Sequence, residues 1–345
     1  MSQSTIRIVA TTIAFAVVAI GGIVALNFSG DTAVTMWAYL TLAALGVAFV
    51  VYAAIEYLQT RSFDSITSQF DTRTLVLMPI AIALNIILGQ TVAAAIKLPI
   101  YLDSIGTILV GVLAGPLAGA LTGLLSNLLW TLLPPPIHND YAAAFSIVAV
   151  VIGLLAGTFS RLGWMRPRPA TDTTRLAIGG VAAIAVVVIL ALLAFVGWQA
   201  IGSEISFIPS SDNLVFTILA VIALLVVVGT IIGLAALLFI KRDLTAAYVV
   251  VAGVITGIVS AIISAPIAAN LFGGVTGAGT DFLVAAFRQA GADISAATLG
   301  QGLISDPIDK VVTFGVVYVI LGAMAVRTKA RYPLGEKLVT VEDAA

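Results

Sequence analysis

Ionisable and amide side chains are rare in this sequence, and the few that interrupt its apolar runs are the residues best placed to do chemistry. Charged residues make up 10% of the 345-residue chain, against 61% apolar residues. Lys97, Tyr101 and Asp103 lie together in one such interruption. Burying a charge in apolar surroundings is costly unless the charge is paired, so these residues mark a binding site or an ion pair. The alternative is an interfacial loop in which both charges face lipid headgroups and water.

A second polar group lies between Ser305 and Lys310. Ser305 or Asp306 can cap a helix that begins there, and Asp306 and Lys310, four residues apart, can pair on one helix face. Two asparagines within apolar segments can either contact a ligand or hydrogen-bond one helix to another. The complete set of predicted binding residues is Asn85, Lys97, Tyr101, Asp103, Asn127, Asn270, Thr276, Asp281 and Asp306.

Several classes of function have no support in the sequence. Cysteine is absent and His138 is the one histidine, so there is no thiolate or histidine cluster for a metal. Phosphate-binding loops, hydrolase and metalloprotease motifs and dinucleotide fingerprints are also absent. The formal net charge of -1 gives no basic field for nucleic acid. We therefore predict a protein that is not an enzyme, with no catalytic residue, no cofactor, no metal and no nucleic-acid partner.

The elements that must position these residues are apolar segments long enough to cross a bilayer. A soluble chain carries roughly a quarter charged residues, whereas this one has a mean hydropathy of +1.15. We predict an all-α, polytopic transmembrane bundle of about ten helices. Gly115 and Pro116 divide one long apolar run, so the fourth and fifth segments can instead be a re-entrant pair or one broken helix. The predicted segments are 7–28, 34–58, 74–93, 97–114, 116–134, 141–162, 174–201, 214–240, 246–270 and 305–327.

The distribution of basic residues predicts the orientation of these helices. With the N-terminus inside, thirteen of the sixteen Lys and Arg residues lie in or beside cytoplasmic segments, and Lys97, Arg288 and Lys310 are the other three. Cytoplasmic loops carry the excess of Lys and Arg, so both ends of the chain are predicted to be cytoplasmic. The thirteen are Arg7, Arg61, Arg73, Arg161, Arg166, Arg168, Arg175, Lys241, Arg242, Arg327, Lys329, Arg331 and Lys337.

The longest predicted outer connection, 271–304, is rich in glycine and contains an amphipathic stretch at 282–289. Ordered connections of this length are usually lids or binding loops. We predict a structured outer cap rather than disorder, because the segment retains apolar residues.

Two predicted helices share a small-residue pattern. Gly119 and Gly123 are followed by Ser126, and Gly253 and Gly257 are followed by Ser260, with a threonine before the second glycine in each case. Glycines four apart let another backbone approach closely. The pattern suggests a parallel internal repeat, although such pairs are frequent in any membrane helix.

Four segments resemble the substrate-binding S components of bacterial energy-coupling factor (ECF) vitamin transporters: Leu98–Thr107 (LPIYLDSIGT), Leu113–Gly119 (LAGPLAG), Ser264–Gly277 and Ser305–Lys310 (SDPIDK). The resemblance covers about 74–327, leaving two extra helices and a cytoplasmic loop in 1–73 and a cytoplasmic tail in 328–345. It implies uptake of a vitamin or similar nutrient across the plasma membrane, and partners that are an ECF transmembrane coupling subunit and two cytoplasmic ATPases. It also implies a gate over 94–103.

The chain departs from the S-component pattern in its larger number of helices and in its docking face, which is reduced to Ala81 beside Asn85. The predicted partner-docking residues are Ala81, Gly119, Gly123, Gly253 and Gly257. Two alternatives remain open: a membrane interaction or sensor subunit without transport, and a self-sufficient secondary transporter.

Overall fold

The computed structural model describes residues 3–26, 28, 32–91, 100–168 and 242–339, together with 174, 177–181, 183–186, 188, 229, 232–233, 236 and 240. All regular elements in these ranges are helical, apart from an isolated bridge at Asp243, which confirms the all-α prediction. Most of the two predicted helices at 174–201 and 214–240 lies outside the described residues, as does Lys97.

Five of the described helices are long and apolar enough to cross a membrane: α1 (Gln3–Ala25), α2 (Ala33–Thr60), α4 (Thr72–Thr91), α7 with the 3-10 turn η3 before it (Ala142–Arg161), and α10 (Thr245–Phe272). A helix needs about 20 apolar residues to span the hydrocarbon core. Each lies within a few residues of a predicted segment. These five helices indicate a multi-pass membrane protein.

Helices α5 (Ile105–Ala114) and α6 (Pro116–Leu132) form an antiparallel hairpin. The turn between them requires glycine, because Gly115 has a φ of 132°. A distant side chain completes it: the Gln69 amide oxygen accepts the N–H of Leu117 at 2.8 Å. The prediction of a helix from residue 97 is wrong at its start, since residues 100–104 are not helical and α5 begins at Ile105.

The small residues predicted to receive a partner protein are occupied by helices of the same chain. A Cβ atom on Gly119 would lie 2.7 Å from Gly111 Cα in α5, and one on Gly123 would lie 2.5 Å from the carbonyl oxygen of Ala149 in α7. Ala81 is buried, and its carbonyl oxygen would lie 2.1 Å from a Cβ on Gly106. These faces hold the bundle together and leave no room for a docking helix.

Helix α12 (Ile294–Ala323) packs along α10 in the same way. A Cβ on Gly253 would lie 2.5 Å from Val311 Cα, and one on Gly257 2.3 Å from Pro307 Cα. The prediction that Ser305 or Asp306 caps this helix is wrong, because α12 begins eleven residues earlier, where Asp293 accepts the N–H of Ala296 at 2.8 Å.

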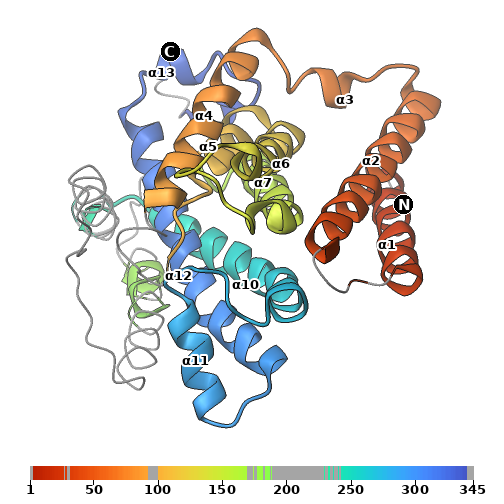
Figure 1. The fold of residues 1–345 in the computed structure, drawn as a ribbon. Helices are drawn as coiled ribbons and strands as arrows, with labels where there is room; N and C mark the ends of the chain where they lie inside the picture. Colours follow the sequence, from red (N-terminus) through yellow and green to blue (C-terminus); the bar gives the residue numbers. More distant parts are fainter. Residues whose placement is uncertain are drawn as a thin grey trace.

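Figure 1 shows α1 and α2 as a separate hairpin beside the bundle of α4–α7, α10 and α12. A hydrogen bond of 3.0 Å from Trp37 Nε1 to the Ala144 carbonyl oxygen joins this hairpin to the bundle. The short helix α3 (Asp64–Thr67) lies in the connection to α4, and α11 (Asp281–Gln289) confirms the amphipathic stretch predicted in the outer segment.

The C-terminal segment crosses one end of the bundle, with the short helices α13 (Val326–Lys329) and η4 (Gly335–Leu338). The N–H of Leu334 donates to the Leu113 carbonyl oxygen at 2.9 Å, and Lys337 Nζ donates to the Arg161 carbonyl oxygen at 3.1 Å. The start of α4 and the ends of α5, α7 and α12 therefore lie at the same end of the bundle as the C-terminal segment. A site at the opposite end of the bundle is formed by the other ends of these helices.

Candidate functional site

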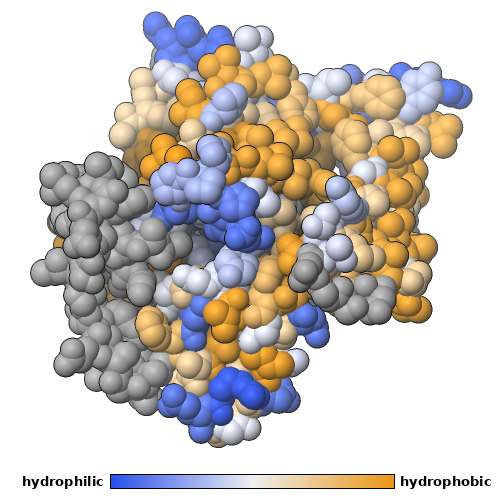
Figure 2. All heavy atoms as spheres, in the orientation of Figure 1, coloured by the Kyte–Doolittle hydropathy of each residue, from blue (hydrophilic) through white to orange (hydrophobic). Residues whose placement is uncertain are grey.

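A cavity of about 140 Å³ opens at the end of the bundle opposite the C-terminal segment. Its walls come from the end of α4, the segment before α5, the end of α6, η3, α7, α10, the loop before α11, and α12. Figure 2 shows hydrophilic side chains gathered between the α4–α7 group and α10, on a face that is otherwise largely hydrophobic. The polar residues that line the cavity are Tyr101, Asp103, Ser104, Asn127, Asn139, Tyr141, Ser260, Ser264, Thr276, Asp281, Gln301, Asp306 and Lys310.

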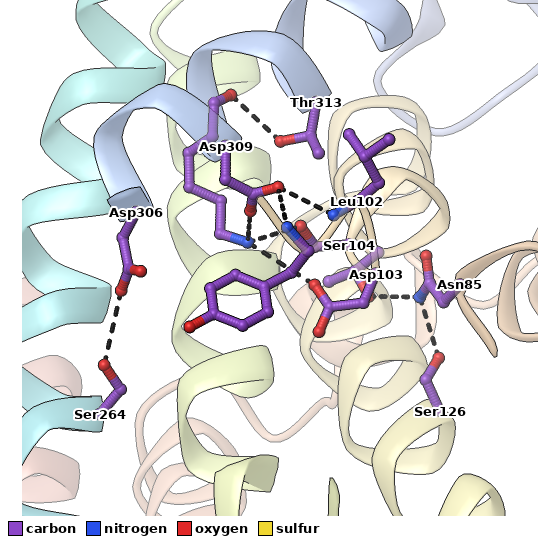
Figure 3. A network of polar contacts seen from close by, with 12 residues as sticks. Asn85, Leu102, Asp103, Ser104, Ser126, Ser264, Asp306, Asp309 and Thr313 are labelled. Atoms are coloured by element: carbon purple, nitrogen blue, oxygen red, sulfur yellow. Dashed lines mark hydrogen bonds and ion pairs between the residues drawn. The ribbon is translucent and has the colours of Figure 1, made fainter. Parts of the chain in front are cut away.

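Asp309, behind the cavity wall, fixes the non-helical segment before α5 (Figure 3). Its side chain is fully buried, and its Oδ1 accepts the backbone N–H groups of Tyr101 and Leu102 at 3.0 and 2.8 Å. Leu102 has a φ of 53° and is itself fully buried. A branched residue in the left-handed region is strained, and such strain persists where the surroundings impose it. Asp309 supplies that constraint.

Lys310 is the one cationic residue that lines the cavity among the described residues. Its Nζ lies 2.5 Å from Asp309 Oδ2, 2.9 Å from Ser104 Oγ and 3.7 Å from Asp103 Oδ1. The predicted pairing of Lys310 with Asp306 on one helix face is replaced by these contacts. Lys310 therefore joins α12 to the start of α5.

Asp306 has hydroxyl groups as its hydrogen-bonding neighbours. Its Oδ1 accepts from Ser305 at 3.1 Å, and its Oδ2 lies 3.4 Å from Ser264 Oγ (Figure 3). The Asp306 side chain is buried, with 5% of the residue exposed. Ser260, one turn before Ser264 on α10, is 1% exposed, and its hydroxyl has no hydrogen-bond partner among the described residues.

The outer wall carries a further carboxylate. Asp281, at the start of α11, accepts hydrogen bonds from the N–H and hydroxyl of Thr276 and from the N–H of Gly277, at 2.8–3.1 Å. Partial burial raises the pKa of Asp281, and these hydrogen bonds oppose the rise. The hydroxyl groups of Tyr101 and Thr280 are 2.8 Å apart, which connects the segment before α5 to this outer wall.

Six of the nine predicted binding residues line the cavity: Tyr101, Asp103, Asn127, Thr276, Asp281 and Asp306. Asn85 does not line it: its amide donates to Thr107 and Ser126 at 2.9 Å and accepts the N–H of Gly106 at 2.7 Å, so it joins α4 to the α5–α6 hairpin. Asn270 is exposed and donates to the carbonyl oxygen of Pro266 at 2.8 Å. Lys97 lies outside the described residues.

Sequence reasoning missed the roles of Asp309 and of the two α10 serines. Asp309 was visible as part of the Ser305–Lys310 group, but its partners lie more than 200 positions away. Ser260 and Ser264 are four residues apart within an apolar run, a spacing that places both on one helix face. This spacing is the feature of the sequence from which a polar face on this helix could have been predicted.

No cluster of three or more His, Cys, Asp or Glu side chains suited to a metal ion occurs in the described part of the chain. The arrangement can bind a small polar molecule: it has hydrogen-bonding groups on several walls and apolar surface from Trp130, Phe145, Val148 and Ile152. Comparison of the chain with family models, curated proteins and solved structures finds no match.

Proposed function

We propose that this protein is the substrate-binding membrane component of a bacterial ECF-type uptake system for a vitamin or similar small nutrient. One observation carries the proposal: three of the four segments that resemble S components meet at one cavity, and the fourth, Leu113–Gly119, lies away from it. Tyr101 and Asp103 come from the first of the three, Ser264 and Thr276 from the second, and Asp306 and Lys310 from the third. They are far apart in sequence, so their convergence is a property of the fold.

The proposed topology is ten transmembrane helices with both termini in the cytoplasm of the bacterial plasma membrane. The bundle supports it because Arg73, Arg161 and the C-terminal segment lie at the end opposite the cavity. This end carries the basic residues expected on the cytoplasmic side. The cavity then opens outward, where a scavenged nutrient arrives.

In this proposal the protein binds and releases the nutrient without changing it, and two ATPases acting through a coupling subunit supply the energy. The segment that precedes α5 acts as the gate. Two hydrogen bonds to Asp309 hold its described part against α12. The hydroxyl contact between Tyr101 and Thr280 holds it on the side of α11. Opening this gate requires the Tyr101–Thr280 contact to break while the Asp309 anchor remains.

The test is uptake in liposomes that contain the full-length chain with or without a coupling subunit and ATPases from the same genome. We expect a vitamin that stabilises the purified protein to accumulate when the ATPases and ATP are present, and not without them. Matched liposomes with an ATPase that cannot hydrolyse ATP are the control. Accumulation without any ATPase would contradict the proposal.

One observation favours the secondary transporter as a second candidate. Asp103, Asp309 and Lys310 form a largely buried charged cluster against a membrane helix, and such clusters couple ion movement to transport in many carriers. Uptake driven by a proton or sodium gradient in liposomes that contain the chain alone would support this candidate.

A further inference from the structure

We propose that the cavity selects a protonated amine: a small, ring-sized molecule whose ammonium group binds beside Asp306. This inference rests on the proposed function, because it names the chemical class of the nutrient. Its first support is the charge balance of the cavity. Three carboxylates line it, those of Asp103, Asp281 and Asp306, against the single ammonium of Lys310 among the described lining residues.

That one ammonium is already committed. Lys310 Nζ contacts Asp309 Oδ2, which lies outside the cavity lining, at 2.5 Å, and Ser104 Oγ at 2.9 Å; the lining carboxylate of Asp103 is farther away, at 3.7 Å. Asp281 is held by three neutral donor groups, and Asp306 by serine hydroxyls. The lining therefore has more carboxyl groups than ammonium groups, and a buried carboxylate whose hydrogen bonds come from hydroxyl groups favours a ligand that brings a cation within hydrogen-bonding distance.

The second support is independent of charge. Ser260 lines the cavity, is 1% exposed, and its Oγ has no hydrogen-bond partner in the part of the chain that the structure describes. A buried hydroxyl without a hydrogen-bond partner is unfavourable. A bound ligand that makes this hydrogen bond would explain why a serine lies at this position. Ser260 and Ser264 lie four residues apart on α10, and Ser264 Oγ is 3.4 Å from Asp306 Oδ2. An ammonium has three N–H donors, which match one carboxylate and two hydroxyl oxygens.

The rest of the cavity suits the apolar body of such a molecule. Trp130, Tyr141 and Phe145 supply aromatic walls, and aromatic faces attract cations as well as apolar rings. A cavity of 140 Å³ is similar in size to the ~150 Å³ cavity that holds benzene. The ligand is therefore one ring or a short chain with its amine.

The first experiment compares three probes of one size on the full-length protein in detergent micelles: benzylamine, benzyl alcohol and benzoate, at neutral pH and equal ionic strength. We expect benzylamine, which is protonated there, to raise the melting temperature and to bind at least tenfold more tightly than the other two. Equal or tighter binding of benzyl alcohol or benzoate would overturn the amine inference and leave the proposed function standing. No binding of any probe would also overturn the amine inference, whereas the proposed function is decided by the liposome uptake experiment.

The second experiment locates the ammonium. Asp306→Asn is expected to weaken benzylamine binding about thirtyfold or more, since loss of one partner of a buried charged contact typically costs ~2 kcal/mol or more. Asp293→Asn is the matched control: it removes one exposed carboxylate from the same helix and retains the cap. Equal effects of the two changes would place the ammonium elsewhere and contradict the inference.

Ser260→Ala separates binding from folding. It removes a hydroxyl without a partner, so the melting temperature of the ligand-free protein should be unchanged or higher. Benzylamine binding should weaken about five- to tenfold, the equivalent of one hydrogen bond. Unchanged benzylamine affinity in this variant would show that the ammonium does not reach Ser260, against the proposed geometry.

Discussion

Asp309→Asn tests whether a buried ion pair holds the segment before α5 in place. The carboxylate of Asp309 is fully buried and makes three contacts, to the N–H groups of Tyr101 and Leu102 and to Lys310 Nζ. Asparagine retains one acceptor oxygen, but an NH₂ group then faces Lys310 if that oxygen stays on the two N–H groups. The nearest carboxylate left to Lys310 is that of Asp103, 3.7 Å away. Removing one partner of a buried pair costs about 3–5 kcal/mol, and we expect a loss of this size in the free energy of unfolding.

The assay is reversible unfolding in mixed detergent micelles, with the double variant Asp309→Asn/Lys310→Met beside the single one. The double variant leaves no uncompensated charge, so we expect it to recover at least half of the lost stability. Asp293→Asn controls for the loss of a carboxylate from α12. A single variant within about 1 kcal/mol of the wild type, or a double variant less stable than the single, would refute the reasoning.

Three further predictions follow from particular contacts. Gly257→Ala should destabilise the protein by about 1–3 kcal/mol in the same assay, because the new Cβ would meet the backbone of α12, whereas Gly46→Ala, with nothing within 4 Å, should not destabilise it. Tyr101→Phe should speed ligand dissociation in stopped-flow measurements, since it removes the hydroxyl contact between the proposed gate and Thr280; an unchanged rate would contradict the proposed gate. The hydrogen bond to Asp140 raises the pKa of the partly exposed His138 above its usual value of 6.5, so its stabilisation is complete below that pH and is lost as pH rises through the higher pKa. Thermal melts from pH 5 to 8 should show this loss in the wild type and not in Asp140→Asn.

Hydropathy predicted the long helices because bilayer thickness sets their length whatever their neighbours are. The expected segments 34–58 and 246–270 correspond to Ala33–Thr60 and Thr245–Phe272. Two helix starts were wrong because hydrogen bonds of polar side chains decide them, a tertiary contact at α5 and a local cap at α12. Residues 100–104 stay out of α5 because Asp309 takes two of their N–H groups, and α12 starts at Ile294 because Asp293 caps it. The periodicity of apolar residues predicts neither of these two contacts.

The sequence allowed individual residues of the candidate site to be identified, but not the contacts that these residues make with one another. A polar residue in an apolar run is conspicuous alone, which is how Tyr101, Asp103 and Asp306 were found. Their partners were not predicted: spacing along one helix suggested Asp306 for Lys310, whereas Lys310 contacts the adjacent Asp309 and, more distantly, Asp103 from the segment before α5. Asn85 was open to both interpretations in the sequence, and its three hydrogen bonds now assign it to helix packing.

The short helix α5 connects the membrane fold to the cavity. Its 10 residues span about 15 Å, half of a ~30 Å hydrocarbon core. Non-helical backbone at membrane depth persists where protein or a cavity satisfies its polar groups. At residues 100–104 Asp309 accepts two N–H groups and Lys310 reaches Ser104, so one turn of α12 supports the irregular segment. The same turn presents Asp306 to the cavity. If the proposed function holds, a movement of α12 shifts the proposed gate and the proposed ammonium site together.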